Sequence, residues 1–190
     1  MQSKQFSRRA LTISLAAVPL GMSAANWVLG AANGTKKQPN AIDGLTDSSE
    51  AIRQEVAFEA IPQRVYDALT NTKQFDAITR LSDGAALLAA PGAKPTDIST
   101  QLGGSFTLFG GYVTGRHLEM LPNERLVQAW RAGSWKAGAY SIVAFSLTAE
   151  GARTKLKFDH CGFPNGNGES LAKGWHAHYW EPLARFLAQS

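Results

Sequence analysis

The most constraining feature of this chain is the pattern of residues 103–187, where short runs of alternating apolar and polar side chains end at clusters of turn-forming residues. Alternation with a period of two is typical of strands that bury one face. The clusters are Gly110-Gly111, Leu121-Pro122-Asn123-Glu124 and Ala149-Glu150-Gly151. Turns of this kind between strand-like runs predict hairpins, so we expect an antiparallel sheet.

The period changes near the C-terminus, where an amphipathic helix is predicted. Its apolar stripe recurs at i, i+4, i+8, i+12 and i+15, through Leu171, Trp175, Tyr179, Leu183 and Phe186. Pro182 lies within this segment and lacks a backbone donor, which predicts a kink. A long helix whose stripe faces an antiparallel sheet predicts an α+β domain with the sheet wrapped around the helix.

The segments before the sheet predict a strand, two short helices and a loop. Residues 51–60 alternate apolar with charged side chains, as a half-buried strand does. Pro62 suits the first turn of a helix, because the backbone N–H that proline lacks would have no partner within the helix there. Residues 73–78 predict a second short helical turn. Residues 81–102 are interrupted by proline and glycine and predict a loop.

The N-terminal residues have the layout of a signal peptide. Basic residues precede an uncharged run over residues 10–35, and small residues allow cleavage after Ala25. The basic residues are Lys4, Arg8 and Arg9. We therefore expect residues 1–25 to direct export, which gives a periplasmic or otherwise exported protein.

The paired arginines indicate one export route. Ser7-Arg8-Arg9-Ala10-Leu11 resembles the twin-arginine signal, although Thr12-Ile13 departs from it. The alternative is an uncleaved membrane anchor, because the uncharged run is long enough to span a bilayer. Residues 26–50 have no apolar period and predict a flexible linker, followed by one folded domain over residues 51–190.

The charge of the chain argues against nucleic-acid binding. The sequence has 19 Lys and Arg against 15 Asp and Glu, a formal net charge of +4. Residues 1–25 hold three of the basic residues and no acidic one, so their removal leaves 16 against 15, a net charge of +1. The remainder has no run of Lys and Arg that could neutralise a row of phosphates.

Cysteine and histidine predict no metal site. Cys161 is the only cysteine, so an intramolecular disulfide and a thiolate cluster are both excluded. We interpret Cys161 as a small apolar residue at a strand end rather than a reactive thiol. His176 and His178 project about 160° apart on a helix and cannot share one ion. No metal and no cofactor are therefore expected.

Seven short motifs in a fixed order resemble a known family. They are GG-x-F at Gly103, G-x-V-x-G at Gly111, P-x-x-R-L-V-x-x-W-R at Pro122, Y-S at Tyr140, G-x-x-x-K-L at Gly151, H-x-G-F-P at His160 and G-W-x-x-x-Y-W-x-x-L at Gly174. Over roughly residues 52–188 this order resembles the activator of heat shock protein 90 ATPase homologue family, within the SRPBCC or START-like superfamily. The resemblance implies a helix-grip fold: a curved antiparallel sheet around a long C-terminal helix, two short helices after the first strand, and an apolar cavity.

The inward-facing strand positions and the helix stripe supply the expected cavity lining. The expected residues are Phe106, Leu108, Trp130, Trp135, Phe158, His160, Trp175 and Tyr179. Aromatic walls would bury an apolar ligand, while the His160 imidazole and the Tyr179 phenol orient its polar end. The alternative is that these residues form an ordinary core, because large aromatic side chains dominate cores.

Three functions follow from this interpretation. The leading one is an exported domain that binds a small hydrophobic or amphipathic molecule between sheet and helix. The second is a protein-partner module like the family's chaperone ATPase activators, against which the predicted export argues. The third is an enzyme like the cyclases and aromatases elsewhere in the superfamily, for which the sequence assigns no catalytic residue. Contact with a membrane is expected only through an uncleaved N-terminal segment.

Overall fold

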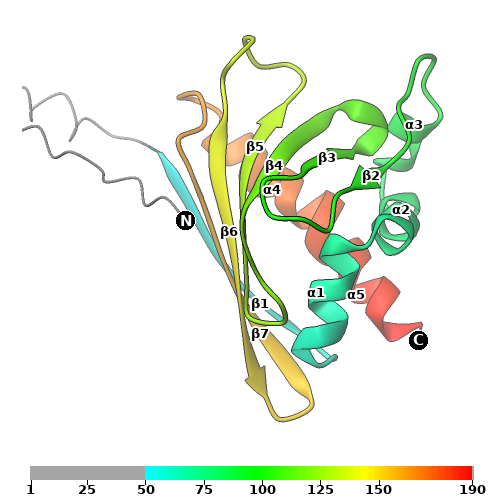
Figure 1. The fold of residues 1–190 in the computed structure, drawn as a ribbon, viewed down its shortest axis with the longest axis vertical. Helices are drawn as coiled ribbons and strands as arrows, with labels where there is room; N and C mark the ends of the chain where they lie inside the picture. The colour runs from blue at the N-terminus through cyan, green and yellow to red at the C-terminus, as the bar shows by residue number, and fades with distance from the viewer. Residues whose placement is uncertain (1–49, 190) are drawn as a thin grey trace, which may run out of the picture. The chain divides into compact units, whose positions relative to one another are not determined.

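The computed structural model describes residues 50–189, which form a seven-stranded antiparallel sheet with helices on one of its faces (Figure 1). The strand order across the sheet is β1-β7-β6-β5-β4-β3-β2. The strands are β1 (Ala51–Phe58), β2 (Asp97–Ile98), β3 (Ser105–Leu108), β4 (Val113–Leu121), β5 (Arg125–Ala132), β6 (Ser141–Glu150) and β7 (Arg153–Cys161). The expected α+β helix-grip fold is confirmed. The predicted signal peptide and residues 26–49 of the predicted linker lie outside the described residues.

Two of the predicted turns join neighbouring strands as hairpins. Asn123 and Gly151 have φ angles of 68° and 66°, the left-handed conformation that lets the chain reverse between β4 and β5 and between β6 and β7. The third predicted turn lies in η1 (Phe109–Gly111), a 3-10 turn between β3 and β4. The antiparallel register places Phe145 of β6 opposite Phe158 of β7.

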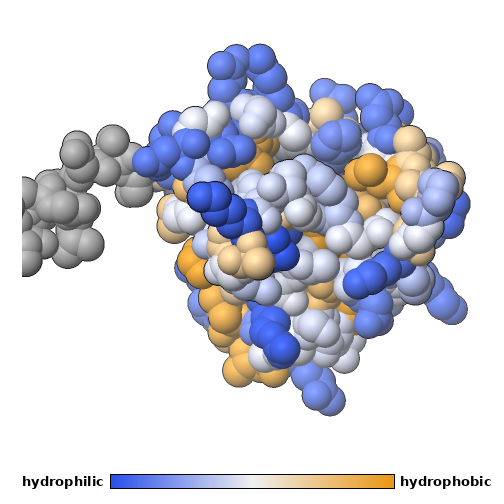
Figure 2. Space-filling view, turned by 90° about the horizontal axis from the view of Figure 1, so that it is seen from above, coloured by the Kyte–Doolittle hydropathy of each residue, from blue (hydrophilic) through white to orange (hydrophobic). Residues whose placement is uncertain are grey.

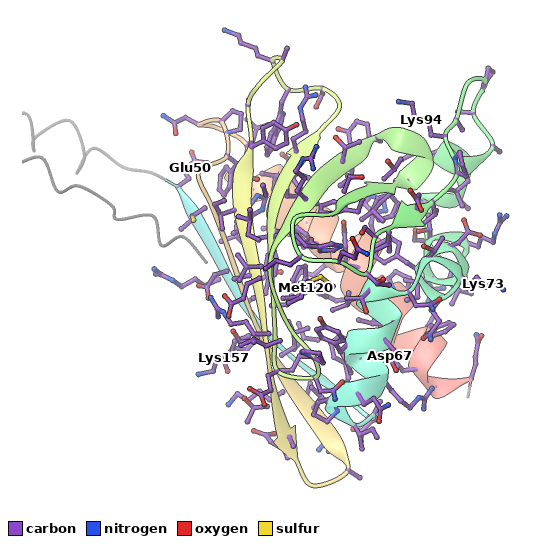
Figure 3. The ribbon with its side chains drawn as sticks, in the orientation of Figure 1. Glu50, Asp67, Lys73, Lys94, Met120 and Lys157 are labelled. Atoms are coloured by element: carbon purple, nitrogen blue, oxygen red, sulfur yellow. The ribbon has the colours of Figure 1, made fainter. Side chains whose placement is uncertain are left out.

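Alternation along the strands separates a buried inner face from a charged outer face. Trp130 and Phe158 are buried, whereas Lys157 and Asp159, the sequence neighbours of Phe158, are exposed. Figure 3 shows Lys157 pointing away from the helices and Met120 lying between the sheet and the helices. The core therefore fills the space between the inner face of the sheet and the helical layer.

Gly115 of β4 marks a close packing point on the inner face. It pairs with Phe106 of β3 on one side and with Trp130 of β5 on the other. A Cβ added at this position would lie 2.0 Å from the Ala129 carbonyl oxygen and 2.3 Å from Cζ of Phe106. Only glycine fits there, so the second glycine of the G-x-V-x-G motif has a packing role.

Three helices lie between β1 and β2. They are α1 (Pro62–Thr70), α2 (Thr72–Arg80) and α3 (Ala85–Leu88). Pro62 opens α1 as expected, and the Asn71 side chain accepts hydrogen bonds from Lys73 and Gln74 amides at the start of α2. The two short helices after the first strand are confirmed. Helix α3 is an addition, since its residues lie in the segment predicted to be a loop.

The C-terminal helix is continuous but changes its period in the middle. It comprises α4 (Gly168–Trp175), a π-helical segment η2 (His176–Trp180) and α5 (Glu181–Ala188). The Glu181 amide donates to the His176 carbonyl, five residues earlier. This wider turn comes directly before Pro182, which has no amide to donate. Because one residue is added to the turn, Tyr179 and Trp180 are both buried against the sheet.

Candidate functional site

A cavity of about 270 Å³ lies between the inner face of the sheet and the C-terminal helix, near the end of the domain that carries η1 and the β5–β6 loop. Its rim includes the exposed side chains of Leu87 and Tyr112. The lining consists of Leu87, Phe109, Tyr112, Val113, Trp130, Ala132, Ser134, Trp135, Asn167, Ser170, Leu171, Gly174, Trp175, His178 and Tyr179. Figure 2, which views the domain from above, shows hydrophobic side chains grouped in separate areas among mostly polar ones.

Three tryptophans and a tyrosine form the inner wall of the cavity. The ring centroid of Trp130 lies 5.4 Å from that of Trp135 and 5.7 Å from that of Trp175. The rings of Trp175 and Tyr179 are 4.1 Å apart. Contacts at these distances and tilts are favourable between aromatic rings and fix their orientation. The wall is therefore rigid, apolar and suited to a flat ring.

Phe109 completes this wall from the opposite side, in an unusual backbone conformation. Its φ of 51° lies in the left-handed region, which a bulky residue rarely adopts. Edge contacts with Phe75 and Tyr179, at 5.6 Å and 5.3 Å between ring centroids, hold the side chain in place. Strain of this kind persists where packing over-determines it, often beside a functional site.

Gly174 of α4 leaves the space that the cavity occupies along the helix. A Cβ at Gly174 would meet only Cδ2 of His178, at 4.0 Å. The position is helical and could hold a larger residue without a backbone clash, in contrast to Gly115. The missing side chain therefore keeps the cavity open rather than allowing a tight turn.

The hydroxyl group of Tyr179, a lining residue of the cavity, has a single hydrogen-bond partner among the described residues. The Trp130 indole Nε1 donates to the Tyr179 oxygen over 3.5 Å. Within residues 50–189 no group accepts the hydrogen of that hydroxyl. Burial raises the pKa of Tyr179 above its usual value, and the bond from Trp130 offsets this only in part. The phenol therefore stays protonated and can donate to a molecule in the cavity.

His178 supplies a second polar atom. Its Nδ1 is buried and has no hydrogen-bond partner among the described residues. Its ring lies 6.2 Å from Phe109 and the residue as a whole is half-buried. His178 was not among the expected cavity residues. Its position next to Tyr179, an expected lining residue, was the sequence signal for it, because the π-turn places both residues in the lining.

His160 faces inward as the strand pattern predicts, but its nitrogens are occupied. Trp175 Nε1 donates to His160 Nδ1 over 3.0 Å, which places the ring proton on Nε2. That Nε2–H donates to the Ser141 hydroxyl over 2.8 Å, and Ser141 donates to the Trp130 carbonyl over 3.0 Å. Burial lowers the pKa of His160 to about 4, so the ring is neutral. The imidazole is part of the core and does not reach the cavity lining.

The family assignment follows from comparison of the sequence with known families. The family described as "Activator of Hsp90 ATPase homolog 1-like protein" matches residues 59–188. The chain belongs to this family. The matched segment begins directly after β1 and ends with α5, so it contains all of the cavity lining described above.

Curated relatives in the family are longer proteins. The human activator of 90 kDa heat shock protein ATPase homolog 1 is 23% identical over 126 residues, covering 66% of this chain and 33% of the relative. The mouse homolog 2 is 25% identical over 94 residues, covering 50% of this chain and 28% of the relative. This member of the Hsp90 ATPase activator family thus spans about a third of the length of the curated relatives it matches.

Solved structures share the fold at low sequence identity. An HSP90 activator from Plasmodium falciparum superposes with a TM-score of 0.62 at 23% identity, covering 73% of this chain and 96% of that one. CalU16 from Micromonospora echinospora gives a TM-score of 0.57 at 20% identity, covering 74% and 77% of the two chains. These similarities establish the helix-grip architecture for this family member.

The structure brings together half of the cavity residues expected in this family member. Trp130, Trp135, Trp175 and Tyr179 line the cavity. The others are buried outside the lining. The ring centroid of Phe106 lies 5.4 Å from that of His117, and the ring centroid of Phe158 lies 4.3 Å from that of Trp175. Leu108 is buried at the end of β3, and His160 is bonded to Trp175 and Ser141. Phe109, Tyr112 and Gly174 were missed because turn and helix residues show no strand alternation.

Residues 50–189 contain no group of three or more His, Cys, Asp or Glu side chains placed to hold a metal ion. His176 is exposed and His178 half-buried, as expected for positions on different sides of the helix. Over the same residues no helix is both long and apolar enough to cross a membrane.

Proposed function

We propose that this protein binds a small hydrophobic or amphipathic molecule in the cavity between β5 and the C-terminal helix. The observation that carries the proposal is the rigid aromatic wall of Trp130, Trp175 and Tyr179 around empty space. Ligand sites are typically apolar cavities with a few polar groups that fix orientation. Tyr179 and His178 provide such groups here.

The size of the cavity limits what it holds. Drug-sized ligands usually occupy about 300–1,000 Å³, and an engineered cavity of about 150 Å³ holds one benzene ring. The 270 Å³ found here lies between these values. The ligand is therefore a one-ring or two-ring compound rather than a long lipid chain.

A cavity-filling substitution tests the proposal. Gly174→Leu would place a side chain in the space beside His178, and Ala177→Leu on the exposed side of the same helix is the matched control. Naphthalene is titrated into each protein while tryptophan fluorescence is recorded. We expect saturable binding by the wild type and by Ala177→Leu, and none by Gly174→Leu. A wild type that binds no naphthalene, or a Gly174→Leu variant that binds it normally, would contradict the proposal.

A natural ligand would identify itself by co-purification. Protein isolated from its own host and measured by native mass spectrometry is expected to carry added mass that solvent extraction removes. Loss of this mass in the Gly174→Leu variant would locate the compound in the cavity. The same added mass in wild type and variant would place the compound elsewhere on the protein.

A protein partner is the second candidate function. It is favoured by the curated relatives, whose names describe activators of a heat shock protein ATPase, and by an exposed apolar area on the outer face of the sheet. Leu118 and Ile142 are 49% and 40% exposed there, and Ile142 pairs with Ala129. The test is ATPase stimulation of heat shock protein 90 by the wild type and by Ile142→Asp. Stimulation that the substitution abolishes would support this function, and absence of stimulation by the wild type would reject it.

Export is part of the proposal and rests on the sequence of residues 1–25. If the arginine pair is read by a twin-arginine receptor, replacing Arg8 and Arg9 together by lysine leaves unprocessed precursor in the cytoplasm. Lys4→Gln, which keeps the pair, is the control. Undiminished export of the double variant would favour a general secretory signal, and retention of uncleaved protein at the membrane would favour an anchor.

The enzyme alternative has little support from the cavity. The titratable side chains in its lining are those of Tyr112, His178 and Tyr179. His160 lies outside the lining and is bonded on both nitrogens. We therefore assign no catalytic residue.

A further inference from the structure

The lining of the cavity contains no charged side chain. Lys, Arg, Asp and Glu are all absent from the residues that form it. Moving an ionised group from water into an apolar site is strongly unfavourable unless an opposite charge or several hydrogen bonds compensate for it. An anionic ligand such as a carboxylate would therefore need another source of positive potential.

Two such sources lie beside the lining. The Arg131 guanidinium is outside the lining and donates to the Trp135 and Lys136 carbonyls. The start of α4 is the other, and it is already occupied. Helix N-termini attract anions through their free amides. At this one the Glu50 carboxylate accepts hydrogen bonds from the Gly166 and Gly168 amides, over 3.0 Å and 2.9 Å. Asn167 and Ser170 of the same turn lie in the cavity lining. The carboxylate of Glu50 thus neutralises the helix end and places negative charge near the rim.

The free hydrogen of Tyr179 is one of two unpaired polar groups in the lining, the other being Nδ1 of His178. A buried donor without an acceptor is unfavourable, and an acceptor that arrives with the ligand removes this penalty. The Trp130 indole already donates to the Tyr179 oxygen, so the hydroxyl is directed to donate rather than accept. The matching group on a ligand is an oxygen with a lone pair.

We propose that the ligand is an uncharged one-ring or two-ring aromatic compound with a hydroxyl, ether or carbonyl oxygen that accepts a hydrogen bond from Tyr179. The flat rings would pack on Trp130 and Trp175. The proposal rests on the proposed function, because it assigns a chemical class to the same cavity. It makes Tyr179 the residue that determines specificity.

Three related probes separate shape from polarity. Naphthalene supplies the rings alone, β-naphthol adds a neutral oxygen, and β-naphthoate adds a carboxylate. Each is titrated into the wild-type protein at neutral pH by isothermal titration calorimetry. We expect β-naphthol to bind about fivefold to tenfold more tightly than naphthalene, as one additional neutral hydrogen bond provides. β-Naphthoate is expected to bind at least about tenfold more weakly than β-naphthol.

Tyr179→Phe removes only the hydroxyl group and keeps the ring in the wall. We expect this variant to lose the preference, so that it binds β-naphthol and naphthalene with similar affinity. Tyr66→Phe is the matched control, because Tyr66 is also a buried tyrosine but lies in α1 outside the cavity lining. It should behave like the wild type with all three probes.

The outcomes separate this inference from the proposed function. If naphthalene and β-naphthol bind equally well, or if Tyr179→Phe keeps the preference, the inference fails while the cavity remains a binding site. Tightest binding by β-naphthoate would also overturn it. If none of the three probes binds, the proposed function fails and the inference fails with it.

Discussion

His160 and Tyr179 contact the same tryptophan from two sides, yet their polar atoms are in opposite states. Trp175 donates its indole hydrogen to His160, and its ring lies 4.1 Å from that of Tyr179. The imidazole has a partner on each nitrogen, whereas the phenol keeps an unused hydrogen beside the cavity. Buried polar groups with all bonds made specify a core, and those with a bond left open are suited to a ligand. The comparison divides one aromatic cluster into a structural half and a binding half.

The largest effect is expected when the shared residue is removed. Trp175→Ala should lower the free energy of unfolding by about 3–5 kcal/mol, because it empties a buried site and leaves His160 Nδ1 without its donor. Urea unfolding followed by circular dichroism measures this change. Trp135→Ala, on the β5–β6 loop, is the comparison and should lower stability less. A loss below about 1 kcal/mol for Trp175→Ala would contradict the shared role.

The next largest effect is expected from acid, which should destabilise the folded protein by protonating His160 in the unfolded chain. The pKa of His160 is lowered by burial from 6.5 to about 4, so the unfolded chain takes up a proton that the folded protein does not. The contribution of this group is complete above pH 6.5 and is lost as pH falls toward 4. The total loss is about 3 kcal/mol, measured by chemical denaturation across this range.

A His160→Asn variant isolates this effect from other titrating groups. Its stability should fall less steeply than that of the wild type between pH 6.5 and 4. A residual slope is expected from His117, whose pKa is also lowered by burial. Equal slopes in variant and wild type would mean that His160 is accessible to solvent in the folded protein.

The smallest pair of effects compares the two halves directly. Ser141→Ala removes the acceptor of the His160 Nε2–H and should lower the free energy of unfolding by about 1–3 kcal/mol. Tyr179→Phe removes a hydroxyl whose one bond is the long one accepted from the Trp130 indole, and should lower it by less, about 0.5–1 kcal/mol. Both are measured by urea unfolding without added ligand. Similar losses in the two variants would remove the distinction between the halves.

The fold could be predicted largely because its signals are local. Strand alternation places Trp130 and Phe158 inside, and the turns at Asn123 and Gly151 have residues that accept a left-handed backbone. These properties depend on a few neighbouring residues, so they can be read along the chain. The inward orientation of His160 was found in the same way.

The site could be predicted only in part because it depends on long-range contacts. The partners of His160 come from β6 and α4, and sequence spacing does not indicate which inward-facing group is bonded and which is free. The π-turn before Pro182 was expected only as a kink, since its width is decided by packing of Tyr179 and Trp180 on the sheet. Phe109 enters the lining through a strained backbone that no propensity favours.

The hydrogen bonds from Gly166 and Gly168 to Glu50 have a mechanical consequence. Glu50 precedes the first strand, at the point where the preceding segment of the chain enters the domain. A force applied to that segment, or a cut immediately after Glu50, acts on the carboxylate that anchors the first turn of α4. That turn carries Asn167 and Ser170 at the cavity rim. Displacement of the Glu50 carboxylate would therefore be transmitted to the entrance of the cavity.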